Sequence, residues 1–235
     1  MHVVLFDIDG TLVKKRSTEA NERERFRRAV SDVVGKTPAT EPWRYDGMVD
    51  PEICRLLLIE LGLRPHEVSQ HLDKVIARVE DIYLTMDKEP VLNEGVDELL
   101  PILSSSSHSR LGVLTGNLSV VGEEKLHLTG IREYFQEAFY SNGYFDRGEL
   151  VRDAVRTCVR KYQLRDSGAV TIVGDTPRDI QAAKANNAMA VGVATGFYLP
   201  SELERAGASA VFRSLKPSNE LLRALRAESD PRQSF

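Results

Sequence analysis

Short, nearly continuous apolar runs recur along the chain and predict the strands of a buried sheet. The clearest runs are VVLF (3–6), RLGVLT (110–115), AVTIVG (169–174) and AMAVGVA (188–194), and AFYS (138–141) and AVF (210–212) are weaker candidates. Continuous rather than alternating apolar residues are typical of parallel strands that are covered on both faces. The sequence therefore predicts an α/β fold with a Rossmann-like parallel sheet.

A helical spacing of apolar residues dominates the segment between residues 17 and 85. Apolar residues at i, i+3, i+4 and i+7 predict three amphipathic helices there, at Phe26–Val34, Ile53–Leu61 and Val68–Tyr83. A fourth stripe of this kind, later in the chain, is Leu150–Tyr162. No convincing strand lies among the first three. We therefore expect an α/β core domain of residues 1–15 and 88–235 and a small all-helical domain of residues 16–87, inserted after the first strand.

Charge and composition exclude several classes of partner. The chain has 31 basic and 35 acidic residues, well mixed, and a net charge of −4. A nucleic-acid-binding protein would show a basic face, so we expect no nucleic-acid partner. No apolar run approaches the roughly 20 residues that cross a bilayer, so we expect no membrane partner.

The two cysteines, Cys54 and Cys158, lack the spacing of a metal site. They are typical of small buried side chains in a reducing compartment. A strand pattern already begins at residue 2, which leaves no room for a signal peptide. We expect a cytoplasmic protein.

The segment FDIDGT (6–11), directly after the first strand, carries the strongest chemical signal. Ligands of open α/β sheets bind outside the carboxyl ends of the strands, where Asp7 and Asp9 fall. Two adjacent carboxylates repel unless something compensates their charge, and Mg²⁺ prefers such carboxylates together with phosphate oxygens. Gly10 allows a sharp turn, and Thr11 adds a hydroxyl.

Two further strand ends carry compatible groups. In TIVGDTPRD (171–179), Asp175 ends a strand and can converge with Asp7 on one ion, whereas Asp179 is equally consistent with a helix-capping role. In GVLTGN (112–117), Thr115 and the backbone N–H groups of Gly116 and Asn117 can bind phosphate oxygens.

These motifs, in this order, resemble those of the haloacid dehalogenase superfamily of phosphohydrolases. FDIDGT resembles its first motif, LTGN its second and VGDTPRD its fourth, and the helical insert resembles its C1-type cap domain. Within the superfamily the chain is most similar to the phosphoglycolate phosphatase and β-phosphoglucomutase branch. The dehalogenase branch lacks the second aspartate of the first motif, so Asp9 argues against cleavage of a carbon–halogen bond.

The resemblance implies a role for each matched residue. Asp7 would attack phosphorus and form an aspartyl-phosphate, and Asp9 would act as general acid and then as general base. Mg²⁺ would be held by the side chains of Asp7 and Asp175 and the backbone carbonyl of Asp9, with support from Asp179. Thr115 and nearby backbone amides would bind the phosphoryl oxygens. The phosphate-binding residues implied in this way are Gly10, Thr11, Gly116 and Asn117.

The third motif of the family is a Lys or Arg that neutralises the nucleophile and the phosphoryl group, usually followed by proline. This chain has no such pair before its fourth motif, and Arg147 of DRGELV (146–151) occupies the expected place. Arg152 is the alternative, although it falls inside a predicted helix. In the cap, Arg44 of EPWRYDGMVDPEI (41–53) could pair with a second anionic group of the substrate or face water.

Three hypotheses for the function follow. The first is Mg²⁺-dependent hydrolysis of a small phosphorylated metabolite by a monomer or homodimer. The second is a sugar phosphomutase of the β-phosphoglucomutase type, which uses the same aspartates. The third is a catalytically silent binding protein on the same scaffold, against which the complete set of acidic motif residues argues.

Overall fold

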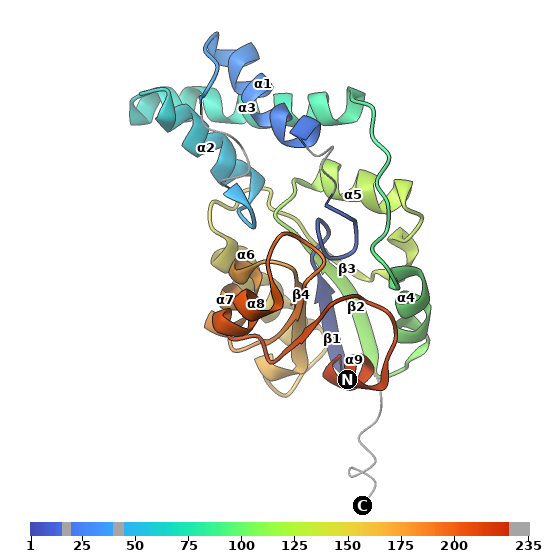
Figure 1. The fold of residues 1–235 in the computed structure, drawn as a ribbon. Coiled ribbons are helices and arrows are strands. Elements are labelled where there is room, and N and C mark those ends of the chain that lie inside the picture. The colour runs from blue at the N-terminus through green and yellow to red at the C-terminus, as the bar shows by residue number, and fades with distance from the viewer. Residues whose placement is uncertain (16–19, 40–44, 226–235) are drawn as a thin grey trace, which may run out of the picture.

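A parallel β-sheet forms the centre of the molecule in the computed structural model, which describes residues 1–15, 20–39 and 45–225 (Figure 1). The strands are β1 (His2–Phe6), β2 (Ser109–Leu114), β3 (Glu137–Phe139), β4 (Val170–Gly174), β5 (Met189–Val193) and β6 (Ala210–Phe212). Their order across the sheet is β3-β2-β1-β4-β5-β6, and each neighbouring pair is parallel. The predicted α/β fold with a parallel sheet is confirmed.

The strands also match the predicted positions closely. All residues of β1 and β4 are buried, as continuous apolar runs require, whereas the edge strands β3 and β6 are half-buried. The strand predicted at AFYS (138–141) lies earlier in the structure, where β3 spans Glu137–Phe139. It ends at Phe139, the last residue that pairs with β2.

Helices cover both faces of the sheet (Figure 1). One face packs on α4 (Val96–Ser105), α5 (Ser119–Leu128) and α9 (Asn219–Ala224), and the other on α6 (Arg147–Lys161), α7 (Pro177–Ala185) and α8 (Pro200–Ala206). Along β1, Val4 and Phe6 enter the first of these cores, whereas Val3 and Leu5 enter the second. This alternation makes a three-layer core domain.

The helices α1 (Ala20–Val34), α2 (Asp50–Glu60) and α3 (Pro65–Thr85) form a separate group beyond the carboxyl ends of the strands (Figure 1). Their apolar sides share a cluster that includes Phe26, Leu57 and Val79. Leu118 and Val121 of the core join the same cluster, so the helical group is packed onto the sheet domain. We call the helical group the cap; its boundaries at residues 16 and 87 stay a prediction.

Several smaller expectations can be compared with the structure. Cys54 and Cys158 are both buried free thiols, as expected. Among the described residues, no helix combines the length and apolar character needed to cross a membrane. Arg44 and the terminal residues 226–235 lie outside the described residues.

Candidate active site

Three carboxylates, two from strand ends and one from the first turn of α7, meet at the carboxyl edge of the sheet. Asp7 follows β1 and Asp175 follows β4, and these two strands are neighbours. The Asp7 N–H donates to the carbonyl of Val173 (2.9 Å), which fixes the two strand ends against each other. One carboxylate oxygen from each of Asp7, Asp175 and Asp179 lies within 4.8 Å of the others, and all three residues are buried. The structure therefore brings together three of the residues that the sequence assigns to a metal.

Gly10 makes the close approach of the first motif to Asp175 possible. Its φ is +85°, which L side chains rarely adopt, and an added Cβ would lie 2.3 Å from Asp175 Oδ2. Thr11 is fully buried one residue later, and its carbonyl accepts a hydrogen bond from Asn93 (2.8 Å). Gly10 and Thr11 thus shape the turn that carries Asp7 and Asp9.

The two carboxylate oxygens of Asp179 have different partners, one in the capping box of α7 and one in the acidic cluster. Its Oδ2 accepts from the Thr176 N–H (3.1 Å), and Thr176 Oγ1 accepts from the Asp179 N–H (3.3 Å), which completes a capping box at the start of α7. Its Oδ1 accepts from Arg147 Nη2 at 2.5 Å. The capping interpretation of Asp179 is thereby confirmed, while one oxygen remains directed at the acidic cluster.

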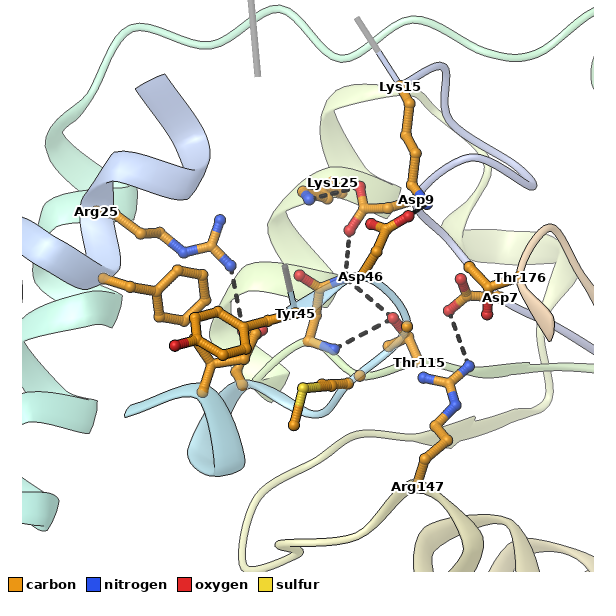
Figure 2. Close-up of a pocket in the computed structure, with 17 residues that line it drawn as sticks. Asp7, Asp9, Lys15, Arg25, Tyr45, Asp46, Thr115, Lys125, Arg147 and Thr176 are labelled. Carbon is orange, nitrogen blue, oxygen red and sulfur yellow. Dashed lines mark hydrogen bonds and ion pairs between the residues drawn. The ribbon is translucent and has the colours of Figure 1, made fainter. Parts of the chain in front are cut away.

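Arg147, the first residue of α6, points into the acidic cluster (Figure 2). Its Nη2 donates to Asp7 Oδ1 (3.3 Å) and to the carbonyl of Leu114 (3.3 Å), besides Asp179, and the side chain is 6% exposed. Arg152 lies one turn further along α6, is half-exposed and pairs with Glu149 and Asp153. The structure thus places Arg147 rather than Arg152 beside Asp7.

Asp9 turns away from the acidic cluster and toward α5 (Figure 2). Asn117 Nδ2 donates to Asp9 Oδ2 (2.7 Å) and to Thr115 Oγ1 (2.9 Å), and Lys125 Nζ donates to Asp9 Oδ1 (2.6 Å). Burial would raise the pKa of Asp9, but the charge and hydrogen bond of Lys125, with the hydrogen bond of Asn117, lower it to about 2. Asp9 is therefore ionised, and each of its carboxylate oxygens has a donor.

The cluster around Asp7 carries more negative charge than its cations balance. Burial, together with the carboxylates of Asp179 and Asp9, raises the pKa of Asp7 to about 6 against the lowering effect of Arg147 and Lys15. Burial likewise raises the pKa of Asp175 well above its ordinary value, although Lys15 Nζ donates to Asp175 Oδ2 at 2.8 Å. Buried carboxylates of this kind are stabilised by a bound cation.

The donor set of this cluster fits Mg²⁺. Hard divalent cations bind carboxylate oxygens, and three converge here. Asp175 Oδ1 is buried and has no hydrogen-bond partner among the described residues. A buried oxygen of this kind needs a partner, and a metal ion can supply it. The residues that could hold the ion are Asp7, Asp175 and Asp179.

The acidic edge opens into a pocket of about 100 Å³ that lies between the sheet and the cap. From the core it is lined by motif residues, including Asp7, Thr115 and Gly116, and from the cap by side chains that include Phe26 and Tyr45. Figure 2 shows the labelled residues pointing toward this shared space. The motif residues therefore line one side of the pocket, and residues of the cap line the other.

Asp50 ties the cap to the core beside this pocket. Its Oδ2 accepts from Arg25 Nη2 (3.2 Å) and from the Leu118 N–H (3.1 Å), and its own N–H donates to the Gly116 carbonyl (2.8 Å). Asp50 is the first helical residue of α2, after the N-cap Val49. Its side chain bridges the two parts of the molecule.

Sequence reasoning missed three cations that line the pocket, namely Lys15, Arg25 and Lys125. For Lys125 the sequence does contain a signal. The residue falls on the buried side of α5, together with Val121, Gly122 and Leu126. A lysine in such a stripe needs a buried partner. Lys15 gave no comparable signal, since its partner Asp175 is 160 residues away.

Comparison with known proteins agrees with this architecture. The family model described as haloacid dehalogenase-like hydrolase matches residues 1–187. A protein named phosphoglycolate phosphatase, from Synechococcus elongatus, is 28% identical over 197 residues, which cover 84% of this chain and 85% of that protein.

Solved structures share the fold over nearly the whole chain. A predicted phosphatase from Clostridium acetobutylicum has a TM-score of 0.69 at 20% identity and covers 97% of this chain and 99% of its own. CbbY from Rhodobacter sphaeroides, in complex with phosphate, has a TM-score of 0.70 at 20% identity, with coverages of 96% and 99%. At these identities the likeness concerns the fold.

Proposed function

Because the chain belongs to the haloacid dehalogenase-like hydrolase family, we propose that it is a phosphatase that hydrolyses a small phosphomonoester through a phosphorylated Asp7. The single observation that carries this proposal is the convergence of Asp7, Asp175 and Asp179 within 4.8 Å, with the Arg147 guanidinium beside them. Phosphoryl transfer needs positioning and neutralisation of charge, and this edge of the sheet offers both.

In the first step, an Asp7 carboxylate oxygen attacks the phosphorus atom. The new bond joins Asp7 to phosphorus, and the bond from phosphorus to the leaving oxygen breaks as that oxygen takes a proton from Asp9. Asp9 is ionised in the structure without substrate, and the negative charge of a bound phosphoryl group beside it favours the protonated form that this step needs. Arg147, whose Nη2 is 3.3 Å from Asp7 Oδ1, neutralises negative charge near the attacking oxygen. Thr115 and the N–H groups of Gly116 and Asn117 bind the phosphoryl oxygens.

In the second step, water replaces Asp7 on phosphorus. The Asp9 carboxylate accepts a proton from the attacking water as the bond between Asp7 and phosphorus breaks, which releases inorganic phosphate. The carboxylate of Asp9 is ionised, which is the form that can accept a proton. Asp9 faces the pocket from the side opposite Arg147, so the two groups act on different parts of the phosphoryl transfer (Figure 2).

Mg²⁺, when held by Asp7 and Asp175 with the Asp9 carbonyl and with support from Asp179, supplies positive charge that lets the carboxylates coexist and balances the phosphoryl group. The protein's own residues then orient the reacting groups. The pocket volume of about 100 Å³ favours a small substrate, such as a short phosphorylated acid of the phosphoglycolate kind. A cytoplasmic location and a monomeric or homodimeric state stay predictions.

The experiment that tests the proposal is phosphate release from a panel of small phosphorylated metabolites. The wild type with Mg²⁺ is expected to release phosphate from at least one, and the Asp7→Asn variant to lose this activity by more than 10³-fold, roughly the effect of losing a nucleophile. EDTA should abolish the wild-type rate. Equal turnover by wild type and Asp7→Asn would contradict the proposal, and isomerisation of a sugar phosphate without net phosphate release would favour the mutase hypothesis instead.

A further inference from the structure

Lys125 is a buried cation that the proposed chemistry does not yet use. It is 1% exposed and ranks among the largest fully buried side chains of the described residues. An ammonium group is costly to bury unless it is paired, so its position requires a specific partner. That partner is Asp9, whose Oδ1 lies 2.6 Å from Lys125 Nζ.

The backbone of α5 directs Lys125 at the site. The helix begins at Ser119, directly after the second-motif residues Thr115 and Asn117. Side chains of a helix lean toward its N-terminus, so a lysine near the end of α5 extends back toward the pocket. Lys125 lies in the last turn, where a cation also suits the helix dipole, but its ammonium group reaches the Asp9 carboxylate instead of remaining at the helix end.

Lys125 and Asn117 together fix the orientation of Asp9. Each donates to a different carboxylate oxygen, at 2.6 Å and 2.7 Å, so rotation of the carboxylate about its last bond would break both hydrogen bonds. Lys125 also lies 5.6 Å from the centre of the Tyr83 ring of α3, in the cap. The same lysine therefore contacts the proposed acid–base residue Asp9, as Figure 2 shows, and also the cap, through Tyr83.

We propose that Lys125 is a positioning residue, which holds the Asp9 carboxylate in the orientation needed to take a proton from the water that attacks the phosphorylated Asp7. This inference rests on the proposed function. It predicts a defect confined to the step in which Asp9 acts as a base. A lysine with a merely structural role would instead affect folding or substrate binding.

The test uses the full chain with Mg²⁺ and p-nitrophenyl phosphate, whose leaving group needs little help from an acid. In Lys125→Met, kcat is expected to fall on the order of 10²-fold, the scale of a misplaced catalytic group. KM should fall in parallel, so that kcat/KM changes less than about threefold, because kcat/KM reports only the steps up to departure of nitrophenol. A pre-steady-state burst of nitrophenol should appear as the phosphorylated enzyme accumulates.

Lys88→Met is the matched control. Lys88 Nζ lies 5.0 Å from the centre of the same Tyr83 ring and is well buried, but it pairs with Glu124 rather than with Asp9. Its replacement should leave kcat and KM near the wild-type values. A second control is Asp9→Asn, in which the further change Lys125→Met should lower kcat by less than twofold, since the lysine acts through Asp9.

The outcomes separate the inference from the proposed function. If the wild type releases no nitrophenol and no phosphate from any substrate, the proposed function fails. If the wild type is active but Lys125→Met matches Lys88→Met, or loses kcat/KM as much as kcat, the inference is overturned. If the circular dichroism spectrum of Lys125→Met differs from that of the wild type, the variant is misfolded and Lys125→Arg is measured in its place. We expect Lys125→Arg to have a lower kcat and an unchanged kcat/KM.

Discussion

The ammonium group of Lys15 lies 2.8 Å from Asp175 Oδ2, although the two residues are 160 positions apart in the sequence. The same ammonium group lies 3.3 Å from Asp46 Oδ2, which belongs to the loop before α2. The side chain of Lys15 is 5% exposed and that of Asp175 is fully buried. Lys15 therefore acts as a counter-ion for one of the carboxylates that we assign to Mg²⁺.

Lys15→Met should destabilise the protein more in EDTA than in Mg²⁺. Removal of one partner of a buried ion pair costs about 3–5 kcal/mol, because the other charge stays buried. Bound Mg²⁺ would compensate Asp175 and reduce that cost. Thermal unfolding in the two conditions measures the difference, and Lys14→Met, a change at the exposed neighbour, is the control. An equal loss with and without Mg²⁺ would contradict this assignment.

Arg147→Met should lower kcat/KM by about 10²–10³-fold, the usual effect of removing one donor that stabilises transition-state charge. Arg147 is the cation beside Asp7, whereas Arg152 is half-exposed and pairs along its own helix. Arg152→Met should therefore stay within about twofold of the wild type, as surface changes usually do. Steady-state kinetics of the two variants distinguish the candidates for the third motif, and a larger loss in Arg152→Met would reverse the assignment.

Gly10→Ala should weaken Mg²⁺ binding as well as stability. The added Cβ would lie 2.3 Å from Asp175 Oδ2, and the positive φ of +85° adds backbone strain of roughly 1–2 kcal/mol. Gly35→Ala is a matched control, because its φ is +75° and nothing lies within 4 Å of the added Cβ. Calorimetric titration with Mg²⁺ should show reduced affinity in Gly10→Ala alone. Equal Mg²⁺ affinity in both variants would show that the contact with Asp175 is unimportant.

The strands and the acidic motif residues could be predicted because their signals are local. An apolar run such as VVLF specifies a buried strand, and parallel strands place their carboxyl ends at one edge, so Asp7 and Asp175 had to converge if β1 and β4 were neighbours. The capping role of Asp179 was equally local, since Thr176 precedes it by three residues.

The remaining parts depend on long-range geometry. The helix α5 was not singled out, because the buried Lys125 interrupts its apolar stripe and because Leu128, its last residue, is half-exposed. Lys125 meets Asp9 across 116 residues, and Arg25 meets Asp50 only when α1 packs beside α2. Pairings of this kind become visible when the cap and the sheet are placed together, and a one-dimensional pattern does not contain them.

The most direct test of the account is a crystal structure of the protein with Mg²⁺ and BeF₃⁻, an analogue of the phosphoryl group. We expect BeF₃⁻ joined to a carboxylate oxygen of Asp7 and the ion bound by Asp7 and Asp175, whose oxygens already lie within 4.8 Å of each other. Two results would contradict the assignment of Asp7 as the nucleophile. One is well-defined density for Mg²⁺ and BeF₃⁻ at another place, and the other is an Asp7 that stays unmodified at a saturating concentration of BeF₃⁻.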